Sequence, residues 1–151
     1  MVETDKKREA IIEGAIKRFI HYGINKTTMN EIAEDLSVSK PSLYYYFPDK
    51  NSLVLGVIEK IFNDYFEMVE KDQFADVPLE DCMAGFIEIR HRFFQKYYML
   101  HLSGGSPDSS LNSDELKEHF MNMHGKNIQL HADIFQRSID KKEIAAMETY
   151  K

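Results

Sequence analysis

Apolar residues recur at helical spacing along most of the chain. Four long segments show this pattern: residues 5–22, 50–71, 79–101 and 114–138. Gly23 is placed to end the first of them and Asp49 to cap the second. The remaining stretches read as a connection at 74–78, a loop at 103–110, a turn at 139–144 and the start of another helix at 145–151. The pattern therefore predicts an all-α fold.

Two shorter amphipathic stretches lie between the first two long segments. Thr28 is followed three residues later by Glu31, which is the pattern of a capping box at the start of a helix. The apolar face of that helix is formed by Met29, Ile32, Ala33 and Leu36. Ser39 is placed to cap a second short helix, and Pro41 falls in its first turn, where a missing backbone N–H costs nothing. Two short helices joined by a tight turn are the pattern of a helix-turn-helix motif.

The second short helix has two different faces. The inward side holds Leu43 and Phe47, with Tyr46 at the boundary, where its ring can lie in the core and its hydroxyl outside. The outward side carries Lys40, Pro41, Tyr44 and Tyr45. Three consecutive tyrosines are a costly exposed surface without a partner, which favours contact with DNA. The alternative is a structural three-helix bundle with a tyrosine-rich surface.

The order of residues in this region resembles that of the TetR-type (tetracycline-repressor-like) family. The resemblance extends over residues 8–60 and is carried by Ile32-Ala33-Glu34, Val38-Ser39-Lys40, Leu43 to Phe47, Lys50 and Leu53. Ser37 and Pro41 occupy positions where the family usually has glycine. If the backbone at Ser37 requires a positive φ, serine there costs about 1 kcal/mol relative to glycine.

The resemblance implies a DNA-binding head in residues 1–48 and a helical ligand-binding and dimerisation body in residues 49–151. The first helix is expected to pack across the helix-turn-helix pair. Matching family positions imply that Lys40, Ser42 and Tyr44 meet the major groove, with Pro41 in the same turn. Residues matching positions that touch phosphates are Thr28, Tyr45, Tyr46 and Lys50. This division agrees with the way proteins read base edges and fix their register on the phosphate backbone.

The resemblance also implies a small-molecule effector, because helices of the body enclose a pocket in TetR-like proteins. Methionine and aromatic side chains suit a small apolar or aromatic ligand. The candidate lining residues are Phe62, Phe66, Phe86, Phe93, Tyr97, Phe120, Met123 and His124. The alternative is that most of these side chains belong to the core.

A homodimer on a palindromic DNA operator is expected for the complete protein. Members of the family build the dimer interface from two further helices, which have no counterpart in these 151 residues. The body therefore looks shortened at its C-terminus. We expect the helices at 79–101 and 114–138 to expose apolar surface, and the chain to be monomeric or to associate non-specifically.

Composition changes this picture little. The net charge is −6, but residues 1–50 hold equal numbers of acidic and basic side chains, so the excess acidity belongs to the second part. That distribution permits DNA binding without indicating it. The single cysteine, Cys82, excludes an internal disulfide, reads as a small buried hydrophobe and suits the cytoplasm. The sequence has neither a membrane-spanning stretch nor the plan of a signal peptide at its start.

Metal binding and catalysis have weak support. His124 and His131 share a helical face and His119 lies nearby, but no close histidine pair or carboxylate completes a metal site. The sequence shows no arrangement of nucleophile and base, and no phosphate-binding glycine loop. We therefore expect no metal, no cofactor and no enzymatic activity.

Together these features predict an all-α transcriptional regulator, a repressor released from its operator by a small-molecule effector. The alternative from a different class is a shortened helical interaction protein that keeps the fold but does not dimerise on DNA.

Overall fold

A computed structural model describes residues 2–71, 77–100 and 114–144. Within these residues every regular element is helical, which confirms the predicted all-α fold. The α-helices are α1 (Val2–Tyr22), α2 (Met29–Asp35), α3 (Lys40–Tyr46), α4 (Lys50–Lys71), α5 (Leu79–Lys96) and α6 (Asp114–Asp140). A short 3₁₀ helix, η1 (Tyr98–Leu100), follows α5.

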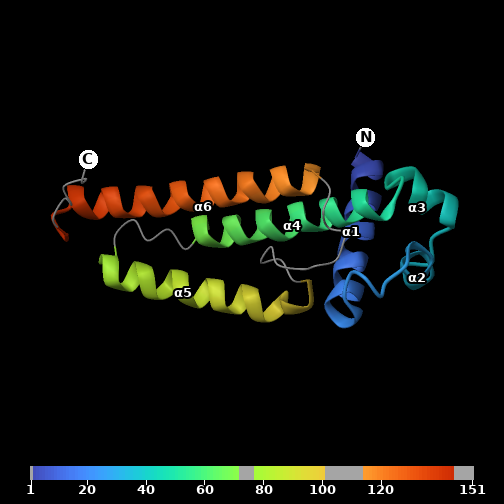
Figure 1. Cartoon of the computed structure of the whole chain (residues 1–151), viewed down its shortest axis with the longest axis horizontal. Coiled ribbons are helices and arrows are strands. Elements are labelled where there is room, and N and C mark those ends of the chain that lie inside the picture. The colour runs from blue at the N-terminus through green and yellow to red at the C-terminus, as the bar shows by residue number, and fades with distance from the viewer. Residues whose placement is uncertain (1, 72–76, 101–113, 145–151) are drawn as a thin grey trace.

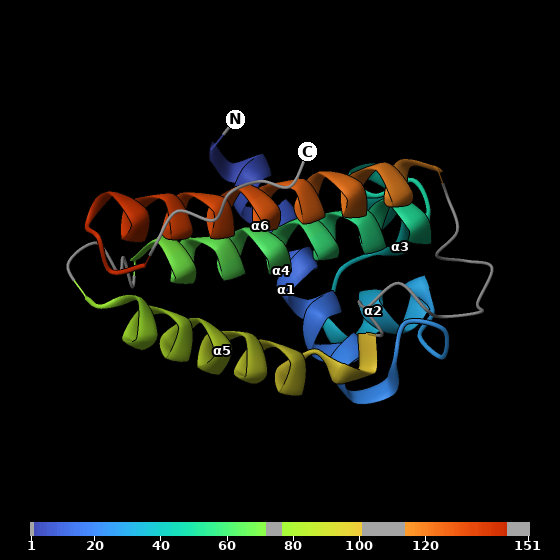
Figure 2. The ribbon, with the colours of Figure 1, turned by 60° about the vertical axis from the view of Figure 1, so that its left-hand side comes forward.

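The helices form a head at one end of an elongated body (Figure 1). Helices α1, α2 and α3 make up the head, and α1 contacts α2 as the sequence predicts. Helix α4 begins beside α3 and continues into the body, where it lies beside α5 and α6 (Figure 2). Helix α5 runs in the opposite direction to α4 and α6. Because α4 takes part in both regions, it is one structural link between them.

One hydrophobic core runs from the head into the body. Phe19, Leu43 and Phe47 fill its head end, and Ile58 and Ile61 of α4 continue it. Leu100 of η1 is also buried in this core, because η1 packs against α1. The chain therefore connects body to head at two places, through α4 and through η1.

Side-chain hydrogen bonds cap the starts of α2, α3 and α4. The hydroxyl of Thr28 accepts from the Glu31 N–H, and the Glu31 carboxylate accepts from the Thr28 N–H, which completes the predicted capping box. Ser39 caps α3 by accepting from Ser42 N. Asp49 likewise accepts from Ser52 N at 2.7 Å at the start of α4.

Two residues in the head adopt the left-handed backbone conformation. Gly23 ends α1 with φ of 79°, as predicted. Ser37 has φ of 52°, so serine occupies a conformation that glycine adopts more easily. The tight turn between α2 and α3 therefore forms despite the missing glycine.

Three helix ends within the described residues differ from those predicted, the first being the start of α1, which lies at Val2 instead of residue 5. The helix predicted for 79–101 stops at Lys96, where Tyr97 leaves the helical conformation and η1 begins. Helix α6 extends to Asp140, two residues beyond its expected end. The loop at 103–110, most of the connection at 74–78 and the helix expected at 145–151 lie outside the described residues.

Gly14 supports a close approach between α1 and α2. A Cβ atom at this position would lie 2.4 Å from Leu36 Cδ2 and 2.9 Å from Leu36 Cγ. We expect Gly14→Ala to lower the free energy of unfolding by about 1–2 kcal/mol, because overpacking outweighs the gain in helix propensity.

Urea denaturation followed by circular dichroism measures the effect of Gly14→Ala. Gly125→Ala is the matched control, since a Cβ there meets nothing within 4 Å and should raise the stability of the single chain. Equal stabilisation by both substitutions would contradict the proposed crowding at Gly14.

Candidate nucleic-acid interface

Helix α3 has one face in the core and one face in solvent. Leu43 is fully buried and Phe47, at the end of the helix, is almost fully buried. On the opposite side Tyr45 is 76% exposed and Tyr44 is 44% exposed. Lys40 and Pro41 are exposed as well, and Ser42 is half-buried. The structure therefore brings together, on one short helix, the residues predicted to meet the major groove.

Tyr46 lies between these two faces. Its side chain is half-buried and packs against the core, and its ring meets the ring of Tyr45 edge-on at a centroid distance of 5.1 Å. The core thus holds Tyr46, and Tyr46 in turn contacts the far more exposed Tyr45. This contact limits the freedom of a large side chain on the solvent face.

The two predicted phosphate contacts outside α3 flank it in sequence. Thr28 is exposed at the start of α2, but its hydroxyl donates to the Glu31 carboxylate at 2.9 Å. A phosphate contact through this hydroxyl requires that hydrogen bond to be exchanged. Lys50 is half-buried at the start of α4.

Arg18 of α1 joins α1 to α2, and sequence reasoning missed this role. Its guanidinium contacts Asp35 at 2.7 Å and Glu31 at 2.9 Å, and it lies over the ring of Tyr22. The hydrogen bond to Asp35 raises the pKa of Arg18. Arg18 therefore neutralises two carboxylates of α2, which lessens the repulsion of an approaching polyanion.

Arg8 of α1 packs against Phe47 at the end of α3. Its guanidinium carbon lies 5.1 Å from the centre of the Phe47 ring, a cation–π contact. A Cβ added at Gly56 of α4 would lie 3.2 Å from Phe47 Cε1, so glycine gives this ring the room it needs. Contacts from α1 and α4 thus fix the end of α3.

Glu31 gives the head a pH dependence. The pKa of Glu31 is below its ordinary value of 4.5, chiefly because its carboxylate accepts from the Thr28 backbone N–H, with further contributions from the Thr28 hydroxyl and Arg18. A lowered pKa stabilises the folded state above the unfolded-state pKa, and that stability is lost as the pH falls through the folded-state value.

We expect the melting temperature of the native chain to fall more steeply below about pH 4.5 than that of Glu31→Gln, because glutamine preserves the capping box but does not titrate. Thermal melts across this pH range measure the difference. Parallel pH curves for the two proteins would show that Glu31 does not contribute.

The eight candidate effector residues are partly brought together. The rings of Phe62, Phe93, Tyr97 and Phe120 pack in one cluster between α4, α5 and α6, with centroid distances of 4.9–6.1 Å. Phe66 contacts Tyr65 beside this cluster, and Phe86 packs against His131. Met123 is buried, whereas His124 is exposed and does not take part in the cluster. Their role in binding an effector stays a prediction.

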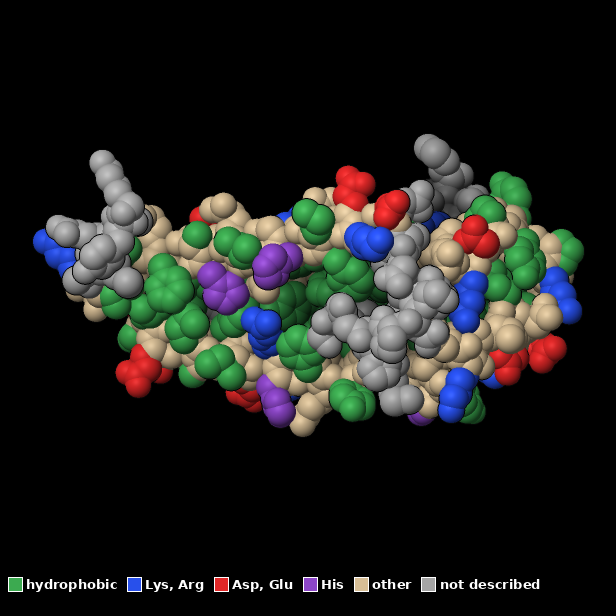
Figure 3. Space-filling view, viewed as in Figure 1, with side chains coloured by type: hydrophobic (Ala, Val, Ile, Leu, Met, Phe, Trp, Pro, Cys, Tyr) green, Lys and Arg blue, Asp and Glu red, His purple; other side chains and the backbone are tan. Residues whose placement is uncertain are grey.

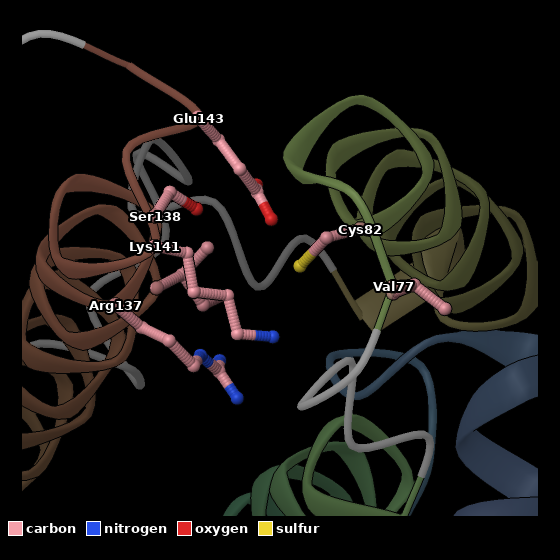
Figure 4. Close-up of a pocket in the computed structure, with 7 residues that line it drawn as sticks. Val77, Cys82, Arg137, Ser138, Lys141 and Glu143 are labelled. Atoms are coloured by element: carbon pink, nitrogen blue, oxygen red, sulfur yellow. The ribbon is translucent and has the colours of Figure 1, made fainter.

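A small pocket lies between the start of α5 and the end of α6 (Figure 4). It is lined by Val77, Cys82, Ile134, Arg137, Ser138, Lys141 and Glu143, so it contains none of the candidate effector residues. Glu143 accepts from the Leu79 N–H at 2.8 Å and so caps α5. Cys82 is buried, and that burial raises the pKa of its thiol.

The described part of the chain contains neither a candidate metal site nor a candidate membrane-spanning helix. Those residues contain no group of three histidine, cysteine, aspartate or glutamate side chains that could hold a metal ion. Among the same residues, no helix is both long enough and apolar enough to cross a membrane.

Comparison with known proteins identifies the head. Residues 11–57 match the family model of bacterial regulatory proteins of the tetR family. The negative transcriptional regulator IcaR of the biofilm operon icaADBC in Staphylococcus epidermidis is 23% identical over 129 residues, which cover 85% of this chain and 68% of IcaR. The transcriptional regulator RutR of Escherichia coli is 39% identical over 115 residues, 73% of this chain but only 53% of RutR.

Solved structures agree over nearly the whole chain. A transcriptional regulator from Cytophaga hutchinsonii is 34% identical with a TM-score of 0.81, and the match covers 94% of this chain and 72% of that one. The TetR-family regulator PfmR from Thermus thermophilus shares the fold at 19% identity with a TM-score of 0.66. The chain therefore belongs to the TetR family of bacterial transcriptional regulators, as the resemblance in its sequence predicted.

Proposed function

We propose that this DNA-binding regulator is a repressor that holds its operator through the exposed face of α3. The proposal rests on one observation. Helix α3 has an exposed face of polar and aromatic side chains, while its cap and its buried face hold it in one orientation. Ser39 caps the start of α3, and Leu43 and Phe47 hold it against the core. A helix of fixed orientation can place side chains against base edges without first being ordered.

The roles of the side chains follow from their positions on α3. Lys40, Ser42 and Tyr44 lie in its first turns and are proposed to meet base edges in the major groove. Exposed Tyr45, the hydroxyl of Tyr46, and Lys50 are proposed to contact phosphates. Thr28 has a weaker case, because its hydroxyl is already bonded to Glu31.

A homodimer would place two α3 helices in successive major grooves, about 34–36 Å apart. The proposed effector binds in the aromatic cluster between α4, α5 and α6, and a change there reaches the head through α4 and η1. The effector would relieve repression if it bound more tightly to a form of the dimer in which the two heads stand at a different separation. The loss of operator affinity would equal the difference in its affinity for the two forms. The similarity to IcaR, a negative transcriptional regulator, supports repression over activation.

Salt dependence tests whether the partner is DNA. An operator is first selected from a random DNA library, and its affinity is then measured by fluorescence anisotropy between about 50 and 200 mM salt. We expect a steep linear fall of the logarithm of the binding constant with the logarithm of salt concentration, because bound phosphates release counterions. Failure to select any sequence, or a flat response to salt, would favour the alternative of a helical interaction protein.

A further inference from the structure

The pocket between the start of α5 and the end of α6 contains a buried hydroxyl group without a hydrogen bond. Ser138 of α6 is 5% exposed and lines this pocket. Its carbonyl accepts from the Glu143 N–H at 2.9 Å, but within the described residues its hydroxyl takes part in no hydrogen bond. Figure 4 shows the Ser138 hydroxyl turned from α6 toward the space that separates α6 from α5. A buried polar group is costly when it is left unpaired, so this hydroxyl is available to a ligand.

Two basic side chains of α6 line the same pocket. Arg137 is half-buried, and among the residues that the structure describes its guanidinium forms no ion pair or hydrogen bond. Lys141, four residues later and therefore on the same side of the chain, is exposed at the edge of the pocket. Figure 4 shows both side chains extending from α6 on the same side as the Ser138 hydroxyl. A guanidinium beside a hydroxyl is a set of donors that suits a carboxylate.

One carboxylate of the chain already reaches into this pocket. The Glu143 carboxylate accepts from the Leu79 N–H at 2.8 Å, at the start of α5, where backbone N–H groups have no partner inside the helix. Glu143 reaches this position through a turn in which Lys142 has φ of 62°, a conformation less favourable for lysine than for glycine. The Glu143 side chain is itself exposed, so it can turn into solvent without disturbing the core. The pocket thus accepts a carboxylate that the fold does not need to keep there.

The charges around the pocket favour a ligand with a single negative charge. When Glu143 turns into solvent, the positive charges of Arg137 and Lys141 remain, together with the positive end of the α5 dipole. The first turn of α5 also carries acidic Glu80 and Asp81. A second negative charge on the ligand would therefore meet repulsion from these two carboxylates. A monocarboxylate suits this balance better than phosphate does.

The rest of the pocket wall is apolar. Ile134 and Cys82 are 3% and 2% exposed, and Val77 lies at the exposed edge. Burial raises the pKa of the Cys82 thiol, which therefore stays neutral. Figure 3 shows further hydrophobic side chains along both α5 and α6 on one face of the molecule, as expected from the sequence. A short hydrocarbon chain attached to the carboxylate would thus have apolar side chains to contact.

We propose that this pocket binds a small aliphatic monocarboxylate, about the size of butyrate, in place of the Glu143 side chain. The carboxylate of the ligand accepts from the Leu79 N–H, the Ser138 hydroxyl and the Arg137 guanidinium, and its hydrocarbon chain packs against Ile134. The space is about 190 Å³ counted with its open side, below the roughly 300–1,000 Å³ of pockets for drug-sized ligands, so only a small molecule fits. The site is separate from the aromatic cluster of the body and does not depend on DNA binding.

Titration of the chain with sodium butyrate at constant ionic strength, followed by amide chemical shifts, tests the site. We expect the largest changes at Leu79 and Ser138, with saturation at millimolar concentration, because so small a ligand makes few contacts. Sodium acetate should bind several-fold more weakly, since it lacks two methylene groups. Butylammonium chloride has a similar hydrocarbon chain with the opposite charge and should cause no saturable change. Butyrate without a saturable change at Leu79, or equal responses to butyrate and butylammonium, would overturn the proposal.

Removal of the internal carboxylate tests whether Glu143 and the ligand compete. Glu143→Ala should bind butyrate about tenfold more tightly than the native chain does, because an intramolecular competitor is gone. Glu118→Ala is the matched control, since it removes one exposed glutamate near the start of α6 and changes the net charge equally. Equal gains in butyrate affinity for the two variants would show a general effect of charge and would overturn the competition.

Removal of the guanidinium tests the other half of the site. Arg137→Gln should weaken butyrate binding by at least about tenfold, because a charged partner of the carboxylate is lost. Circular dichroism checks that the variant keeps the native helicity, and this comparison with the native chain does not require Glu143→Ala to fold. Lys117→Gln is the matched control, a basic residue in the first turn of α6, and should leave the affinity unchanged. A folded Arg137→Gln chain with native butyrate affinity would overturn the proposal.

Discussion

Phe47→Ala is expected to lower the free energy of unfolding by about 3–5 kcal/mol, the largest effect of any single substitution considered for the head. Phe47 is 2% exposed, ends α3 and contacts Leu43 through the backbone hydrogen bond that closes the helix. Arg8 covers its ring and Gly56 leaves room beside it, so a shortened side chain leaves a cavity that neighbours fill poorly. A loss of this size is a large share of the stability of an ordinary domain.

Urea denaturation followed by circular dichroism measures this loss. Phe94→Ala is the matched control, since the same side chain on α5 is 43% exposed and its removal should cost far less in the single chain. Equal losses for the two substitutions would show that Phe47 does not fix α3 to the core.

The double substitution Lys40→Ala and Tyr44→Ala is expected to weaken operator binding by about 2–6 kcal/mol, since each lost base contact costs about 1–3 kcal/mol. In affinity this is at least a thirtyfold loss. Both side chains are exposed, so helicity and melting temperature should stay close to those of the native chain. Binding to unrelated DNA should change much less, because phosphate contacts outside these positions remain.

Lys96→Ala with Tyr98→Ala is the matched control for that double substitution. It removes the same two side-chain types from exposed positions at the end of α5 and in η1, outside the helix-turn-helix pair. Fluorescence anisotropy with the selected operator measures both variants. Equal affinities for the two variants would remove Lys40 and Tyr44 from the base-reading surface.

Local features of the head could be read from the sequence because they depend on residues a few positions apart. Thr28 and Glu31 complete their capping box within one turn, and Ser39 reaches Ser42 over the same distance. The division of α3 into a buried and an exposed face follows from helical spacing alone. Helical spacing places Tyr46 at the boundary between these two faces, and its side chain is half-buried there.

Features that depend on how helices cross could not be read in the same way. Arg18 reaches Glu31 and Asp35 only because α1 crosses α2 at one particular level. Leu100 enters the core of the head because the chain leaves α5 at Tyr97 and turns back to α1, which periodicity does not indicate. His124 lies next to buried Met123 but points to solvent, since adjacent residues on a helix lie about 100° apart.

The central claim is that DNA is bound by the exposed face of α3. The most direct test is an amide chemical-shift map of the full chain titrated with its selected operator. The largest changes are predicted at Lys40 and at Ser42 to Tyr46, with smaller ones at Thr28 and Lys50. Saturable binding that shifts amides of α5 and α6 while leaving those of α3 unchanged would contradict the account.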